Sequence, residues 1–410
     1  MKKLSVLTGV LLLFFTVFSQ TGLPAFWRAN LVRKDSVRVV FNIATGKENG
    51  KTVLYVLNAE EKIKINNVSI TKDSVNFLMP AFESTFKTKR NRDGSLEGIW
   101  TKGTGGDYQY WPFYAFPGQD YRFIKNQGKA KTNISGKWDV TITRPNGTLR
   151  KAVAILNQQN DKLTGSFLTP SGDYRYLEGI VTGDSLKLST FDGSHALTFY
   201  AIIADTQKIV NGVFYSGING KEKWIAVKNE NIPLPSQDEP THLREGESKL
   251  NFSFKDLDGK PVSINDERFR NKVVIIQIMG SWCPNCLDET KFLNEYYINN
   301  RSRGVAVIAL AYEYSTDIER SKKSLQKFQQ LFQVQYPMLI TGATAADDSK
   351  TEKTLPQLTP IRSFPTTLFI DTKGNVRKIK GSFYGPGTGK YFDAYKKEFY
   401  DIVDGLLNEK

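Results

Sequence analysis

Cysteine and histidine are scarce in this chain of 410 residues, which contains two of each. A chain that used disulfides as structural staples would carry more cysteines and space them further apart, so a disulfide framework is excluded. A closed zinc site needs about four ligands, and His195 and His242 lie in different segments without finger spacing. The sequence therefore predicts no metal and no cofactor, and apolar cores must supply the stability.

The amino terminus has an apolar run, but the run is too short to span a bilayer. The run Leu4–Phe18 follows Lys2 and Lys3 and is shorter than the roughly 20 residues that span a bilayer. This pattern is typical of a secretory signal peptide over residues 1–19, with a single-pass anchor as the alternative. No cysteine directly follows the run, which excludes a lipid-anchored amino terminus. We therefore expect the mature chain to be exported.

Positive charge is plentiful but not concentrated. The formal net charge of +14 is spread over the whole length in short clusters such as Lys87–Arg92, which runs into a turn signal. A nucleic-acid-binding protein would show a basic stripe on a recognisable module, so no nucleic-acid partner is expected.

The first half of the chain alternates apolar and polar residues over short segments broken by turn dipeptides, which predicts β-strands and no long helix. A weak internal repeat, for example WRANLVR against WDVTITR, indicates two related units at residues 20–130 and 131–230. We expect two small antiparallel barrels or sandwiches, or together one larger closed sheet. Residues 231–248 are rich in proline and charge and are predicted to form a linker.

Residues 249–410 change to apolar strands that alternate with helices, which predicts an α/β domain. One helix is expected over residues 315–332. It opens with the cap-type residues Ser315, Thr316 and Asp317, and it is expected to bury Ile318, Leu325, Phe328 and either Leu331 or Phe332. The terminal helix has its apolar residues at helical spacing, which is typical of a core-facing helix.

The aromatic stretch at residues 106–123 allows two interpretations. Large aromatics dominate small β-cores, so the stretch could form core and hairpin. It could also be an exposed platform for a glycan, lipid or protein ligand.

Both cysteines lie in the segment GSWCPNCLDE, residues 280–289. A strand ending at Met279 and a helix beginning near Pro284 would place Cys283 at the helix amino terminus and Cys286 one turn inside. Unpaired N–H groups and the helix dipole stabilise a thiolate there, which lowers a thiol pKa from about 8.5 toward 7. Cys283 should therefore attack a disulfide, and Cys286 should resolve the mixed disulfide.

Together with SFPTTLFID at residues 363–371, this segment resembles the TlpA-like and ResA-like thiol-disulfide oxidoreductases of the thioredoxin superfamily. The resemblance covers residues 249–410 and implies a thioredoxin-like α/β fold. It also implies an enzyme of the periplasm or cell envelope that reduces protein disulfides through a redox-active disulfide and takes part in cell redox homeostasis.

The resemblance also assigns roles to individual residues. Cys283 matches the nucleophile and Cys286 the resolving thiol, and these two form the redox disulfide. Glu289 matches a glutamate that tunes the protonation of the thiols. The substrate-binding residues it implies flank the disulfide; they are Trp282, Phe364 and Pro365, the last as a cis-proline.

Two departures from related proteins refine this expectation. Thioredoxin has a buried aspartate where this chain has Gln277, which shifts proton handling onto Glu289. The dipeptide Pro284-Asn285 lacks the histidine of strongly oxidising relatives, which favours a reductase.

Peroxiredoxins carry a threonine at the position of Gly280, which argues against a peroxidase. The alternatives that remain are a disulfide-forming or isomerising enzyme, and a β-domain binding protein in which the thioredoxin-like domain is accessory. A reductase outside the cytoplasm would need an electron donor, for which a membrane thiol transporter is expected.

Overall fold

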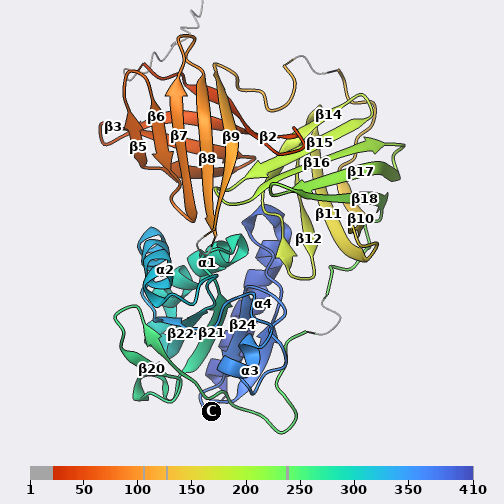
Figure 1. Ribbon diagram of the computed structural model, residues 1–410. Coiled ribbons are helices and arrows are strands. Elements are labelled where there is room, and N and C mark those ends of the chain that lie inside the picture. The colour runs from red at the N-terminus through yellow and green to blue at the C-terminus, as the bar shows by residue number, and fades with distance from the viewer. Residues whose placement is uncertain (1–21, 105–106, 126–127, 237–239, 410) are drawn as a thin grey trace, which may run out of the picture.

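The computed structural model describes residues 22–104, 107–125, 128–236 and 240–409. The expected signal peptide, residues 1–19, lies outside these described residues. Figure 1 shows two β-rich parts above an α/β part, with helix α1 at the face of the α/β part that meets them. Within the described ranges, no helix combines the length and the apolarity needed to cross a membrane.

The first β-part is one antiparallel sheet in the order β4-β3-β2-β1-β9-β8-β7-β6-β5. Strands that follow one another in the chain are neighbours in the sheet, except β4 and β5, which form its two ends, and the last strand pairs with the first. Five large aromatics, Trp27, Phe41, Phe86, Trp100 and Phe113, are fully buried in its core. The strands are β1 (Phe26–Val32), β2 (Arg38–Glu48), β3 (Lys51–Asn58), β4 (Glu61–Ile65), β5 (Asn67–Ile70), β6 (Val75–Leu78), β7 (Glu83–Arg90), β8 (Leu96–Thr104) and β9 (Asp107–Pro117).

The second β-part is a closed barrel. Its sheet has the order β11-β10-β18-β17-β16-β15-β14-β12-β13, and an added pairing of β11 with β12 closes the ring. Trp138, Phe167, Phe199 and Trp224 fill its interior. The strands are β10 (Gly136–Thr143), β11 (Leu149–Gln159), β12 (Lys162–Thr169), β13 (Gly172–Asp173), β14 (Leu177–Thr182), β15 (Ser185–Phe191), β16 (Ala196–Ile203), β17 (Lys208–Ser216) and β18 (Gly220–Lys228).

The prediction of an all-β amino-terminal region is confirmed. Among the described residues the two sheets share no strand, so they do not join into one larger closed sheet. Both follow the same path, since the first strand of each, β1 and β10, pairs with the last strand, β9 and β18.

A buried arginine joins the two β-parts. Arg122 lies between them with a side chain only 3% exposed. All of its guanidinium nitrogens donate hydrogen bonds, to Ser189 Oγ (3.0 Å) and O (3.1 Å), Leu57 O (3.0 Å), Asn58 Oδ1 (3.0 Å) and Glu178 Oε2 (3.3 Å). This set of five bonds is therefore lost if the two parts separate.

The α/β part is built on a mixed sheet in the order β20-β19-β23-β22-β21-β24-β25, in which β21, β22 and β23 are parallel. Every residue of β21 and β22 is buried, as expected of apolar strands covered on both faces. The strands are β19 (Ser253–Asp256), β20 (Pro261–Ser263), β21 (Val273–Met279), β22 (Val305–Ala311), β23 (Met338–Ile340), β24 (Thr366–Ile370) and β25 (Val376–Lys380).

Helices α1, α2 and α4 contribute to the apolar core on one face of this sheet. The helices are α1 (Pro284–Asn300), α2 (Ile318–Phe332), α3 (Lys350–Thr354) and α4 (Lys390–Asn408), with short 3-10 turns at Glu267–Phe269, Arg301–Arg303 and Pro386–Thr388. In α2, Asp317 is the N-cap among the three cap-type residues, and Leu325 and Phe328 are buried as predicted. Of the last pair, Phe332 packs against the core and Leu331 is 39% exposed. The prediction that Ile318 is buried is wrong: this first helical residue is 52% exposed, because it lies on the outward side of the first turn.

The segment expected to be a linker is only partly free of the α/β part. From Thr241 onward it contacts residues 357–362, through bonds that include Thr241 Oγ1 to Pro360 O (2.9 Å) and Arg244 N to Gln357 O (2.8 Å). The carboxy-terminal half of this segment is therefore anchored to the α/β part.

Candidate active site

The two cysteines lie at the junction of β21 and α1. Cys283 is the N-cap of α1, and its Sγ accepts a hydrogen bond from the N–H of Cys286 (3.2 Å). Pro284 occupies the first helical position, where its missing N–H has no cost. Cys283 and Cys286 form a disulfide, and both residues are buried, at 3% and 0% exposure. In the reduced state the helix terminus would favour a thiolate at Cys283.

Trp282 covers one side of the disulfide. Its Nε1 donates to Tyr312 O (2.9 Å), and its ring packs against Tyr314 (4.5 Å between centroids) and edge-on to Phe364 (5.4 Å). A Cβ at Gly280 would overlap the indole ring of Trp282. Glycine at this position therefore lets the tryptophan fold back over the bend.

The backbone of Phe364 borders the other side. The Phe364–Pro365 peptide bond is cis, and the Phe364 carbonyl oxygen lies 3.5 Å from Cys283 Sγ. The structure thus brings the pair Trp282 and Cys283 next to the pair Phe364 and Pro365, which lies about eighty residues further along the sequence.

Glu289 lies below the disulfide on the buried side of α1 and is 1% exposed. Its carboxylate accepts hydrogen bonds from Thr367 Oγ1 (2.6 Å), Tyr395 OH (2.7 Å) and Gln277 Nε2 (2.9 Å). Burial raises the pKa of Glu289, and these three donors oppose the rise only in part. Because Gln277 Nε2 also contacts Cys286 O (3.4 Å), Glu289 is connected to the resolving cysteine.

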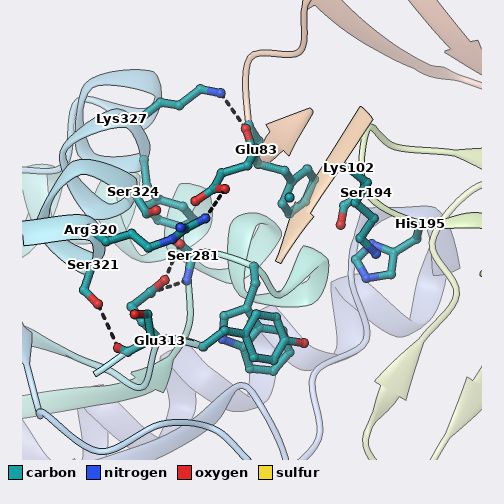
Figure 2. A pocket seen from close by; sticks show the side chains of 17 residues that line it. Glu83, Lys102, Ser194, His195, Ser281, Glu313, Arg320, Ser321, Ser324 and Lys327 are labelled. Carbon is teal, nitrogen blue, oxygen red and sulfur yellow. Dashed lines mark hydrogen bonds and ion pairs between the residues drawn. The ribbon is translucent and has the colours of Figure 1, made fainter. Parts of the chain in front are cut away.

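The sequence reasoning missed a second buried carboxylate, Glu313, which directly follows β22 and the buried Tyr312. Glu313 accepts hydrogen bonds from the backbone N–H (2.8 Å) and the hydroxyl (2.7 Å) of Ser281, two residues before Cys283 (Figure 2). Burial raises the pKa of Glu313, with the Ser281 bonds opposing it. Its position past the carboxyl end of a parallel strand could have identified it, since functional groups gather at that edge.

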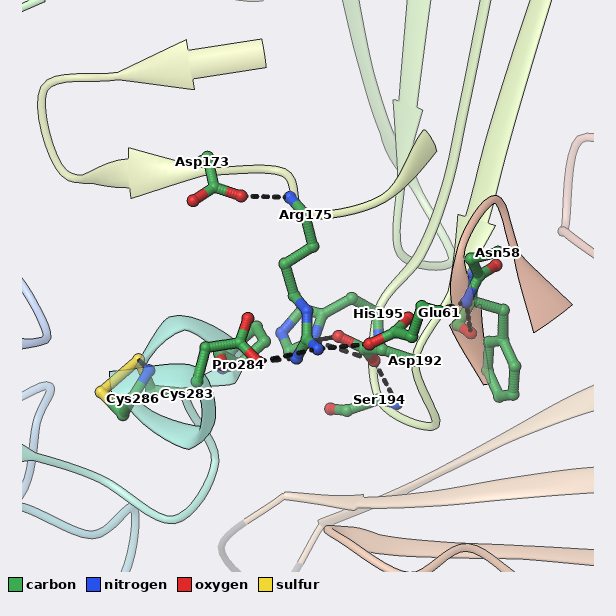
Figure 3. Close-up of polar contacts among 12 residues, drawn as sticks. Asn58, Glu61, Asp173, Arg175, Asp192, Ser194, His195, Cys283, Pro284 and Cys286 are labelled. Carbon is green, nitrogen blue, oxygen red and sulfur yellow. Dashed lines mark hydrogen bonds and ion pairs between the residues drawn. A yellow bond between two sulfur atoms is a disulfide. The ribbon is translucent and has the colours of Figure 1, made fainter. Parts of the chain in front are cut away.

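The β-region contacts the cysteine motif directly. Arg175, in the loop after β13, donates to the carbonyl oxygen of Pro284 (3.3 Å) and forms ion pairs with Asp288 (3.1 Å) and with Glu61 of the first β-part (Figure 3). The side-chain amide of Asn285 pairs with the backbone of Asp173, donating to its carbonyl (3.3 Å) and accepting from its N–H (3.0 Å). Both residues between the cysteines are therefore held by the second β-part.

Asp288, one turn into α1, is a further residue that the sequence reasoning missed. Burial raises its pKa to about 7, and the Arg175 guanidinium opposes the rise. Neither Arg175 nor Asp288 carries a sequence signal for this contact, because they lie 113 residues apart in different parts of the fold.

A cavity of about 460 Å³ lies between the end of the second barrel and the disulfide. We call it the interdomain cavity. Its α/β side consists of Trp282, Cys283, Pro284, Asn285 and Phe364. Its barrel side consists mainly of charged and aromatic residues, among them Arg150, Tyr174, Asp192, Phe214 and Glu222.

The comparisons with known proteins agree on the class of the α/β part. Residues 246–379 match the AhpC/TSA family. The chain is 29% identical over 137 residues to thiol-disulfide oxidoreductase ResA of Bacillus thuringiensis subsp. konkukian, which covers 33% of this chain and 69% of that protein. ResA of Bacillus subtilis is 24% identical over 137 residues, or 33% of this chain and 67% of that protein.

Among solved structures, the chain is similar to a putative protein disulfide isomerase from Bacteroides thetaiotaomicron. The TM-score is 0.30 at 20% identity, over 40% of this chain and 93% of that one. The family match and the ResA relatives confirm the predicted thioredoxin-like domain. The ResA relatives confirm the predicted enzyme class, thiol-disulfide oxidoreductase.

Proposed function

We propose that this chain, whose α/β part is a thiol-disulfide oxidoreductase domain related to ResA, reduces disulfides of peptide or protein substrates by dithiol-disulfide exchange. One observation carries the proposal: Cys283 is the N-cap of α1, bonded to Cys286 and bordered by the Phe364 carbonyl. The proposed nucleophile, Cys283, thus lies next to its resolving partner, Cys286, and to the Phe364 carbonyl group, which can bind a substrate backbone.

The exchange has two steps. The Cys283 thiolate attacks one sulfur of the substrate disulfide, forming a mixed disulfide and expelling the other substrate sulfur as a thiolate. The Cys286 thiolate then attacks Cys283 Sγ, which releases the second substrate thiolate and forms the Cys283–Cys286 disulfide. The substrate gains two electrons and the protein loses two. We assign Glu289 the role of taking the proton from the Cys286 thiol, because it is buried on the same helix three residues after Cys286. Gln277 Nε2, which donates to the Glu289 carboxylate and to the Cys286 carbonyl oxygen, fixes the carboxylate beneath the start of α1.

The reducing direction and the electron donor are part of this proposal. Pro284-Asn285 between the cysteines contains no histidine, which supports a reductase. A dithiol donor, for which we propose a membrane thiol transporter, must regenerate the two thiols after each turnover. Equilibration with thiol redox buffers measures the potential: a value near about −200 mV or below supports a reductase, and one near about −120 mV contradicts it.

Cysteine variants test the exchange itself. Pre-reduced wild-type protein should reduce an added disulfide in a single turnover, and Cys283→Ser should abolish the reaction. Cys286→Ser should accumulate a mixed disulfide at Cys283, detectable as a mass increase that dithiothreitol reverses. The double variant is the matched control. Undiminished activity in Cys283→Ser would refute the proposal, and rapid oxidation by hydrogen peroxide instead of disulfides would favour a peroxidase.

Export to the periplasm or cell envelope is proposed from Lys2, Lys3 and the apolar run that follows them. Cell fractionation and amino-terminal sequencing of the mature protein test it. A mature protein in the cytoplasm that still carries residues 1–19 would contradict export.

A ligand-binding role of the β-region is a second candidate, favoured by the outer face of β9. Trp111 and Phe113 are buried, as the core interpretation expects. The side chains of Tyr108 and Tyr110 are instead exposed, at 53% and 62%, next to Ile99 of β8, which is 47% exposed. We propose this tyrosine face as a site for a glycan, lipid or protein ligand. Titration of the full chain and of Tyr110→Ala against glycan and lipid panels tests it, and equal binding by both proteins would contradict it.

A further inference from the structure

The interdomain cavity is the space into which Cys283 faces, and its size limits what can reach the sulfur. A volume of about 460 Å³ is within the range of roughly 300–1,000 Å³ that holds small ligands. A folded domain of 100 residues has a radius of gyration of about 13 Å, far too large to enter. With the β-region in place, Cys283 is 3% exposed, so a disulfide on a folded surface cannot approach it directly.

The β12–β13 hairpin closes the cavity on the side of α4. The Asp173 carboxylate accepts from the N–H of Gly385 (2.7 Å), Ser382 Oγ donates to Pro170 O (2.6 Å), and Tyr384 OH donates to Thr169 O (3.3 Å). An apolar cluster of Val153, Leu168 and Tyr384 lies behind these bonds. Together with Arg175 on Pro284 and Asp288, they hold the hairpin against the cysteine motif.

The first β-part adds contacts on the side of α2. Lys327 of α2 donates to the carbonyl oxygens of Met79 (3.0 Å) and Phe82 (2.6 Å), and Arg320 forms an ion pair with Glu83 (Figure 2). The second β-part therefore holds the cysteine motif and the first β-part holds α2 beside it. Most of these contacts are hydrogen bonds and ion pairs, so the β-region can move away from the α/β part at a moderate cost in water.

The lining of the cavity carries charges of both signs. Arg144, Arg150 and Arg175 contribute three cations, and Asp173, Asp192 and Glu222 contribute three anions, with His195 beside Asp192. Arg150 pairs with Glu222 (2.7 Å) and Tyr174 OH (2.6 Å), while its buried Nε has no hydrogen-bond partner among the described residues. Trp282, Phe214 and Phe364 supply apolar surface next to these groups.

We propose that the interdomain cavity binds short, peptide-like disulfides that carry both ammonium and carboxylate groups, and that the closed β-region keeps folded proteins from Cys283. This inference rests on the reductase function proposed above and defines its substrate class. A ligand with both charges matches a lining of three cations and three anions, and the aromatic surface accommodates its methylene and disulfide groups. The chemistry is the two-step exchange already described, with two small thiols as products.

Substrate size is tested with pre-reduced full-length protein in single turnovers, followed by alkylation and mass measurement of its thiols. The disulfides are oxidised glutathione and insulin, and each rate is divided by the rate of dithiothreitol with the same disulfide. In the wild type we expect the normalised glutathione rate to exceed the insulin rate at least about tenfold. Arg175→Ala removes the bonds to Pro284, Asp288 and Glu61, and should raise the insulin rate about tenfold.

Gly387→Ala should disturb the contact between the Arg175 loop of the second β-part and the α/β part, from the α/β side. A Cβ at Gly387 would lie 2.8 Å from the backbone carbon of Arg175 and 3.0 Å from its oxygen, too close to fit without a shift. This variant should also raise the insulin rate. Gly405→Ala is the matched control, because a Cβ there meets nothing within 4 Å. Circular dichroism and thermal unfolding check the fold of each variant, and the two opening variants are independent.

The charge preference is tested with bis(2-hydroxyethyl) disulfide, which is small and uncharged. We expect wild-type protein to prefer oxidised glutathione over it about tenfold after normalisation. Arg150→Gln should lower the glutathione rate about tenfold and leave the rate with the uncharged disulfide within about twofold. Lys151→Gln, at the next position of β11 with a side chain 64% exposed, should change neither rate.

The outcomes separate this inference from the proposed function. If the pre-reduced wild type and both opening variants are oxidised by none of the three disulfides, the reductase proposal itself fails. If wild type reduces insulin as fast as glutathione, and neither Arg175→Ala nor Gly387→Ala changes the ratio, the cavity does not select substrates. Equal loss of both small-disulfide rates in Arg150→Gln would overturn the charge preference.

Discussion

Arg122 is the single side chain whose loss should most weaken the β-region. Substitution by alanine removes five hydrogen bonds, to Ser189, Asn58, Leu57 and Glu178. Asn58 Oδ1 and Glu178 keep one other donor each across the boundary, Phe191 N–H and Ala59 N–H. Breaking a buried ion pair by removing one partner costs about 3–5 kcal/mol. The remaining carboxylate, Glu178, is partly accessible at 19%, so we expect the lower half of that range, about 3–4 kcal/mol.

Differential scanning calorimetry measures this loss. For a β-region of about 200 residues, 1 kcal/mol corresponds to roughly 2–4 °C, so Arg122→Ala should lower Tm by about 10 °C. The matched control is Arg92→Ala, an exposed arginine of the first β-part, which should change Tm by less than about 2 °C. A shift of Arg122→Ala no larger than that of Arg92→Ala would refute the role of Arg122 as the link between the two β-parts.

Three further changes address the active site. Glu289 has a folded pKa above its ordinary value of 4.5, so its protonated form contributes stability that is complete below that value and is lost as the pH rises through the folded pKa. Glu289→Gln should remove this pH dependence from denaturation curves, and an unchanged slope would contradict the burial argument. Gly280→Thr should displace the Trp282 ring and lower the single-turnover rate about tenfold, with a change in tryptophan fluorescence; a wild-type rate and spectrum would show that the bend tolerates a side chain. Glu313→Ala should lower stability by about 2–4 kcal/mol in urea denaturation, because two Ser281 donors lose a buried acceptor, and a loss below about 0.5 kcal/mol would count against this role.

Local patterns were sufficient to predict the elements that carry the chemistry. The apolar run of β21, the glycine bend and Pro284 predicted a strand, a turn and a helix around Cys283, and the structure contains them in that order. The cap-type residues Ser315, Thr316 and Asp317 correctly marked the helix start, and Asp317 is the one whose side-chain oxygen accepts the first N–H groups. The burial of Ile318 could not be deduced from spacing alone, since the first turn lies beyond the packed face.

Contacts between distant parts of the fold could not be predicted. The bonds from Arg175 to Pro284 and Asp288 depend on how the second barrel sits on α1, and no periodicity or motif encodes that placement. Glu313 was missed for a different reason. It follows an apolar strand and reads as an ordinary loop residue until the bend at Ser281 is folded against it.

Because the β-region covers Cys283, it also affects how long a reduced protein keeps its electrons. Thiolates in an oxidising compartment are lost to diffusing oxidants at a rate that depends on their accessibility. At 3% exposure, the Cys283 residue presents little surface to large oxidants such as the disulfides of folded proteins. If the closed β-region excludes folded proteins as proposed, the two thiols of the reduced form would be protected from oxidation by protein disulfides that are not substrates.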